Sequence, residues 1–103
     1  MKVGLIVAME SEQQALRSIG IDNAVLSGIG KVNAAIAATE LIIREKADCI
    51  ISSGVAGGID KVLKVGDLVL ANQVAHHDVW CGEGNLPGQV QGLPQRFCAD
   101  STL

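Results

Sequence analysis

Apolar residues along the chain fall in short continuous runs that alternate with stretches of helical spacing. Residues 2–8, KVGLIVA, form an almost unbroken β-branched and apolar run, which predicts a strand buried on both faces. Shorter runs predict further strands at 24–27, 48–53 and 67–75, and helical spacing predicts helices at 9–19 and 31–45. The alternation predicts an α/β fold, in which a mostly parallel or mixed central sheet is flanked by helices.

Beyond residue 75 the chain becomes polar and rich in glycine and proline, so we expect coil with short elements as far as Leu103. With 103 residues, of which 49% are hydrophobic and 18% charged, the chain has room for one globular domain, residues 1–103. The first apolar run is too short to cross a bilayer and lacks a signal-peptide cleavage site, so no membrane partner is expected.

The charge and the cysteine content limit the classes of partner and the cellular compartment that we expect for this protein. The net charge is −3, and the sequence has no stripe of basic residues that could bind a phosphate backbone. Only 2% of the residues are aromatic, so few side chains could stack on bases, and no nucleic acid is expected as a partner. Three cysteines without a C-x-x-C pair argue against a disulfide framework and a zinc site. We therefore expect a cytoplasmic protein that needs neither a metal nor a cofactor.

Two glycine loops each follow a predicted strand: SGIGK at 27–31 and SGVAGG at 53–58. In doubly wound sheets, ligands bind beyond the carboxyl ends of the strands, and glycine lets the backbone approach them. Neither loop is a complete P-loop or dinucleotide-binding motif. Each loop is therefore explained about equally well by a ligand site and by a tight turn.

Glu10 and Glu12 open the first predicted helix, where acidic side chains complement the helix dipole. A carboxylate at this position also follows the first strand directly, so it could act as a general base on a bound substrate. The residues alone leave both interpretations open. His76-His77-Asp78 does not favour a metal site, because adjacent side chains on a strand point to opposite faces.

Taken in order, five segments resemble the amino-terminal half of the 5′-methylthioadenosine/S-adenosylhomocysteine nucleosidases, of the purine nucleoside phosphorylase superfamily. They are MKVGLIVAMESE at 1–12, SGIGKVNAA at 27–35, SSGVAGG at 52–58, LKVGDLVLA at 63–71 and HHD at 76–78. The resemblance implies hydrolysis of the N-glycosidic bond of adenine thionucleosides, with a nucleoside and water as small-molecule partners. It also implies a homodimer, with Trp80 and Leu86 as candidates for its interface.

The resemblance implies a role for individual residues of the site. Glu12 corresponds to the carboxylate that deprotonates the attacking water. Ala8 and Met9 border the water and the ribose, and Ile29 lines the 5′-alkylthio end. The resemblance further places three residues along the purine and ribose: Val55, Ala56 and Gly57.

The chain departs from the family pattern in three ways. Val55 stands where many relatives have serine, and valine cannot donate a side-chain hydrogen bond, which argues against phosphorolysis. The family usually has two strands before SGIGK, whereas here Gly20 and Ala24 are joined almost directly. The Met-Glu ribose clamp and the Ser-Asp pair that protonates adenine are also absent, so we expect weak or no activity from this chain alone. Another nucleosidase or phosphorylase, such as a futalosine hydrolase, or a non-catalytic α/β module remain alternatives.

Overall fold

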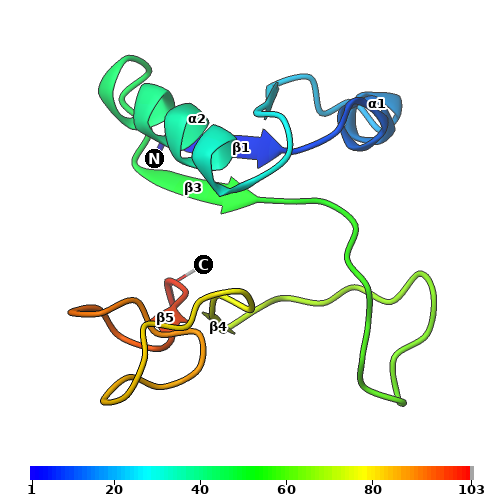
Figure 1. Cartoon of the computed structure of the whole chain (residues 1–103). Helices are drawn as coiled ribbons and strands as arrows, with labels where there is room; N and C mark the ends of the chain where they lie inside the picture. Colours follow the sequence, from blue (N-terminus) through cyan, green and yellow to red (C-terminus); the bar gives the residue numbers. More distant parts are fainter. Residues whose placement is uncertain (103) are drawn as a thin grey trace. The chain divides into compact units, whose positions relative to one another are not determined.

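The computed structural model describes residues 1–102 and divides into two compact units, Met1–Ile59 and Asp60–Leu103 (Figure 1). Leu103, the last residue of the predicted carboxyl-terminal coil, lies outside the described residues. All of the predicted site residues belong to the first unit.

The first unit is built on a three-stranded parallel sheet in the order β2-β1-β3. Its strands are β1 (Val3–Val7), β2 (Ala24–Leu26) and β3 (Cys49–Ser52). The central position of β1 explains its continuous apolar run, since Ile6 is 5% exposed and Val7 only 1%. The predicted parallel sheet is therefore confirmed for the first three strands.

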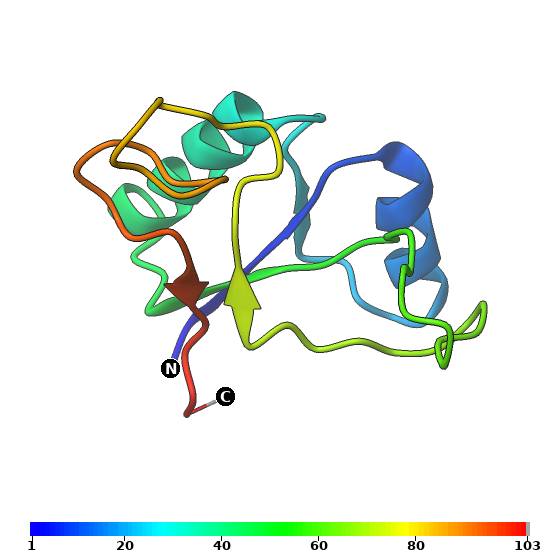
Figure 2. The ribbon, with the colours of Figure 1, turned by 60° about the horizontal axis from the view of Figure 1, so that its bottom comes forward.

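Two helices, α1 (Glu10–Ser18) and α2 (Lys31–Ile43), connect these strands. Because β2 and β3 lie on opposite sides of β1, right-handed crossovers place the two helices on opposite faces of the sheet, as Figure 2 shows. Gly20 ends α1 with a φ of 88°, and its N–H bonds to the Arg17 carbonyl while the Ile21 N–H bonds to that of Leu16. This compact glycine turn lets β2 begin only four residues after Gly20.

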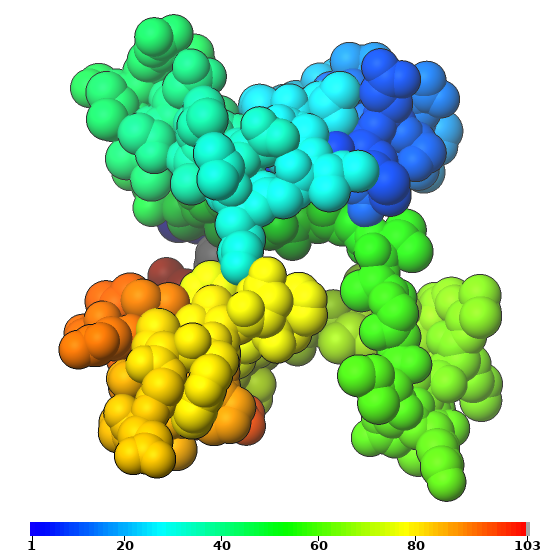
Figure 3. Space-filling view, viewed as in Figure 1, coloured from blue at the N-terminus to red at the C-terminus, as the bar shows by residue number. Residues whose placement is uncertain are grey.

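Helix α2 carries apolar side chains on its outer side as well as on its inner side. Ala37 is buried, whereas Val32, Ile36 and Ile43 are more than half exposed. These three residues lie along one side of the helix at helical spacing, and α2 forms much of the blue-green surface in Figure 3. The first unit thus presents an apolar helix face to solvent.

The second unit contains two short antiparallel strands, β4 (Gln73–Val74) and β5 (Phe97–Cys98). The prediction of a strand over residues 67–75 is therefore wrong, except at Gln73 and Val74. Leu68 and Leu70 are 98% and 89% exposed, and no strand within residues 1–102 pairs with them. An apolar run forms a strand only where a neighbouring strand takes up its backbone hydrogen bonds.

Among residues 1–102, none of the helices has both the length and the apolar character needed to span a bilayer. The same residues contain no cluster of three or more histidine, cysteine or acidic side chains arranged to hold a metal ion. His76 instead packs edge-on against Phe97, with ring centroids 6.1 Å apart.

Candidate functional site

Three segments leave the sheet of the first unit along the same edge. The Ser27 N–H donates to the Val7 carbonyl at 2.9 Å, and the Ser53 N–H donates to the Ile6 carbonyl at 2.9 Å. These bonds continue the parallel pairing just past the ends of β2 and β3. Both glycine loops and the start of α1 therefore begin at the carboxyl edge of the sheet, where ligands bind in doubly wound folds.

The Glu12 side chain is buried at this edge, with 8% of the residue exposed. Its Oε1 accepts hydrogen bonds from the backbone N–H groups of Ala8, at 3.2 Å, and Met9, at 2.9 Å. Its Oε2 accepts the backbone N–H of Val55 at 2.7 Å. Three backbone donors from two segments far apart in the sequence thus fix the position of one carboxylate.

The hydrogen bonds to Glu12 separate the two interpretations of this residue. Glu12 occupies the third position of α1, and its bond to the Met9 N–H is the one that a capping box makes there. A capping role does not require the bond to Val55, which lies 43 residues further along the chain. Glu12 therefore does more than begin a helix, because it also holds the SGVAGG loop against the end of β1.

Val55 takes part through its backbone and not through its side chain. Its N–H donates to Glu12, while the residue as a whole is 84% exposed. The hydrogen bond to Glu12 therefore does not depend on whether residue 55 is valine, as here, or serine, as in the family pattern. Ala56 and Gly57 continue the loop as exposed residues, and nothing lies within 4 Å of the position that a Cβ on Gly57 would occupy.

A shallow groove of about 690 Å³ runs along the same edge beside Ala8 and Met9. Leu26 and Ile29 add apolar surface to it, and Ile29 is 73% exposed. The structure thus brings Ile29 to the groove that Ala8 and Met9 share. Glu12 does not line the groove itself, but its carboxylate accepts the backbone N–H groups of Ala8 and Met9, which do.

The SGIGK loop that forms one wall of this groove is held by Asn33. The Asn33 Nδ2 donates to the Ile29 carbonyl at 2.8 Å. Gly28 and Gly30 have φ values of 87° and 99°, a left-handed conformation that favours glycine. The glycines of SGIGK therefore serve a tight turn, and that turn places Ile29 in the groove.

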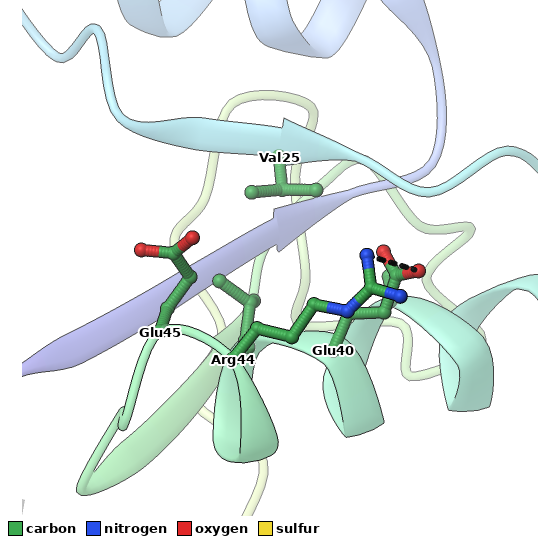
Figure 4. A pocket seen from close by; sticks show the side chains of 6 residues that line it. Val25, Glu40, Arg44 and Glu45 are labelled. Atoms are coloured by element: carbon green, nitrogen blue, oxygen red, sulfur yellow. Dashed lines mark ion pairs between the residues drawn. The ribbon is translucent and has the colours of Figure 1, made fainter.

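A second hollow of about 200 Å³ lies between β2 and α2 (Figure 4). Val25 lines it together with Glu40 and Arg44, whose charged groups form an ion pair at 3.9 Å. Glu45, another lining residue, pairs with Lys2, which precedes β1. This hollow therefore reaches toward the amino ends of the strands, the opposite edge from the one where ligands of doubly wound folds bind.

Two positions with a part in this arrangement are not singled out by the sequence patterns. Gly54 packs against the Glu12 carboxylate, and Asn33 holds the SGIGK turn. A glycine that follows a buried strand is an available signal for the first. For Asn33 the available signal is weaker: an asparagine inside the first turn of a mostly apolar helix.

Comparison with known proteins identifies the family of this fold. The family model described as the phosphorylase superfamily matches residues 23–103. The chain belongs to the phosphorylase superfamily. The match begins at residue 23, the last residue of the short connection between α1 and β2.

Within the superfamily, the chain is a homologue of 5′-methylthioadenosine/S-adenosylhomocysteine nucleosidases. The nucleosidase from Exiguobacterium is 42% identical over 125 aligned positions, which cover 100% of this chain and 54% of that protein. Since the chain has 103 residues, the relative carries residues within the aligned region that this chain lacks. The chain spans about half the length of the curated relatives it matches.

Two crystal structures of such nucleosidases match almost the whole chain. The Neisseria meningitidis enzyme, in complex with methylthio-immucillin-A, has a TM-score of 0.86 and 41% identity over 98% of this chain and 53% of its own. The Colwellia psychrerythraea enzyme, in complex with adenine, has a TM-score of 0.88 and 36% identity over 98% and 51%. The α/β fold and the nucleosidase resemblance are confirmed by these matches.

Proposed function

We propose that this chain supplies the water-activating side of an N-glycosidase site. The reaction is hydrolysis of adenine thionucleosides, such as 5′-methylthioadenosine and S-adenosylhomocysteine, to adenine and the thioribose. The observation that carries the proposal is the buried Glu12 carboxylate, which three backbone N–H groups hold at the carboxyl edge of the sheet. A general base must have a fixed position within hydrogen-bond reach of the proton it takes.

In the proposed reaction, Glu12 takes a proton from water while the water oxygen bonds to the anomeric carbon of the ribose. The bond between that carbon and the adenine nitrogen breaks, and its electron pair leaves with adenine. Adenine then gains a proton from an acid or from solvent water. The negative carboxylate also stabilises the positive charge that develops on the ribose.

The residues beside Glu12 have the small or apolar side chains that such a substrate needs. Ala8 and Met9 would border the water and ribose, and the exposed Ile29 would contact the apolar 5′-alkylthio group. The exposed SGVAGG loop would pass along the purine and ribose, with contacts from Val55, Ala56 and Gly57. Relatives crystallised with methylthio-immucillin-A and with adenine support this class of ligand.

We expect adenine release to be independent of phosphate. Val55 has no side-chain hydroxyl, so the loop lacks one donor that could hold a phosphate ion beside the ribose. The test incubates the protein with 5′-methylthioadenosine in buffers that contain either phosphate or sulfate at equal ionic strength. Equal rates, with free thioribose as the product, support hydrolysis. A rate that rises with phosphate and a ribosyl phosphate product would identify a phosphorylase.

We also expect a homodimer in the cytoplasm. The exposed apolar side chains of α2, Val32, Ile36 and Ile43, support association with a second copy. The free thiols of Cys49, Cys81 and Cys98 support a reducing compartment. Light scattering coupled to size exclusion should give twice the mass of 10.7 kDa, and a monomeric mass at all concentrations would contradict the dimer.

A further inference from the structure

The Gly54 backbone lies directly against the Glu12 carboxylate. A Cβ built on Gly54 would collide with the Glu12 Oε2 and would lie 3.0 Å from the Glu12 Cδ. Oε2 is the atom that accepts the Val55 N–H, the next backbone group along the chain. Any side chain at position 54 would therefore have to displace the carboxylate from Val55, or displace the loop from the carboxylate.

The hydrogen bonds also determine which oxygen of Glu12 can receive a proton. A carboxylate oxygen has two lone pairs. Oε1 uses both, for the N–H groups of Ala8 and Met9, whereas Oε2 accepts one hydrogen bond within the described part of the chain. One lone pair of Oε2 is therefore the remaining acceptor position, and it belongs to the oxygen that Gly54 contacts.

We infer that Gly54 is a positioning residue for the proposed reaction. Because Gly54 has no side chain, the Glu12 carboxylate can reach the Val55 N–H. This bond fixes the orientation of Oε2, and the remaining lone pair of Oε2 is then the one that accepts the proton of water. The inference rests on the proposed function for the proton step alone. The contact of Gly54 with the carboxylate can be tested without any activity.

Gly57 provides a matched control in the same loop. A Cβ at Gly57 would meet no atom within 4 Å, and the backbone there has no left-handed φ. A Gly57→Ala variant therefore adds the same methyl group at a place where it touches nothing, although Gly54 has a φ of 158° that a side-chain-bearing residue rarely adopts and Gly57 does not. A difference between Gly54→Ala and Gly57→Ala reports the collision with Glu12 together with the backbone strain at position 54, and the double-mutant cycle with Glu12→Ala separates these two effects, because the strain is present in both backgrounds.

The structural test measures amide hydrogen exchange and the amide NMR shift of Val55 in the whole chain. Losing a hydrogen bond to a charged acceptor should reduce the exchange protection of the Val55 amide roughly 10- to 100-fold in Gly54→Ala. Gly57→Ala should leave the protection unchanged. Protection that is equal in Gly54→Ala and in the unmodified chain would overturn the inference.

A double-mutant cycle with Glu12→Ala separates positioning from a general effect on folding. In the Glu12→Ala background the carboxylate is absent, so adding Gly54→Ala should change the urea midpoint much less than it does in the unmodified chain. Equal shifts in both backgrounds would show that Gly54 acts independently of Glu12, and they would overturn the inference.

A single-turnover assay of adenine release then tests the proton step. Gly54→Ala should slow the chemical step at least tenfold, whereas Ser52→Ala, which changes an exposed side chain at the end of β3, should not. If Gly54→Ala loses the Val55 contact but keeps its rate, the assignment of Oε2 is wrong. If Glu12→Gln also keeps its rate, the proposed function itself fails, although the positioning contact stands.

Discussion

We expect only weak adenine release from 5′-methylthioadenosine by this chain, and replacing Glu12 by glutamine is expected to slow that release further, by roughly 10²- to 10⁴-fold, the usual contribution of general acid–base catalysis. Glutamine has nearly the same shape, but its amide cannot take a proton from water. Its NH₂ group also cannot accept the backbone N–H that Oε2 accepts from Val55. The measurement is a single-turnover assay, with protein in excess, that follows adenine by chromatography.

Glu10→Gln is the matched control for this experiment. Glu10 lies in the same first turn of α1 but is exposed, so its replacement removes one negative charge from the same helix end. Loss of a favourable charge at a helix terminus costs about 0.3–1 kcal/mol in either variant. Only Glu12→Gln should lose activity. An equal loss in both variants would mean that Glu12 acts only as a negative charge that stabilises the amino end of α1, and not as a general base.

The central strands could be predicted from the sequence because their apolar runs have a single physical cause. Residues Val3–Val7 are β-branched or apolar because β1 has a strand on each side and a helix over each face. The run at 67–75 is also rich in apolar residues, but it pairs only at Gln73 and Val74. Composition shows that a segment suits a strand, but it does not show whether a neighbouring strand is present.

The candidate site could be predicted in part, for a related reason. Sequence patterns report side chains, so the acidic residue after β1 was an evident candidate, but they could not separate a helix cap from a general base. The bond that distinguishes them comes from the backbone of Val55, whose valine side chain gives no sign of it. The part played by Gly54 is hidden for the same reason, since it consists in the absence of a side chain.

Replacing Ile6 by alanine is expected to lower the free energy of unfolding of the first unit by about 2–5 kcal/mol. The loss is large for this unit because its buried apolar side chains are few. They are Ile6, Val7, Ala24 and Ala37. Ile6 is the largest of these side chains, and a domain is typically stable by only about 5–15 kcal/mol.

The Ile6→Ala substitution should also disturb the candidate site. The Ile6 carbonyl accepts the Ser53 N–H at the point where the SGVAGG loop begins. Ile59→Ala is the control, since it removes the same atoms from a residue that is 98% exposed. Urea unfolding followed by circular dichroism should shift strongly for Ile6→Ala and by less than about 0.5 kcal/mol for Ile59→Ala. Similar shifts would mean that the unit is not stabilised by the β1 core, and the edge that holds Glu12 would then depend on contacts other than those of this sheet.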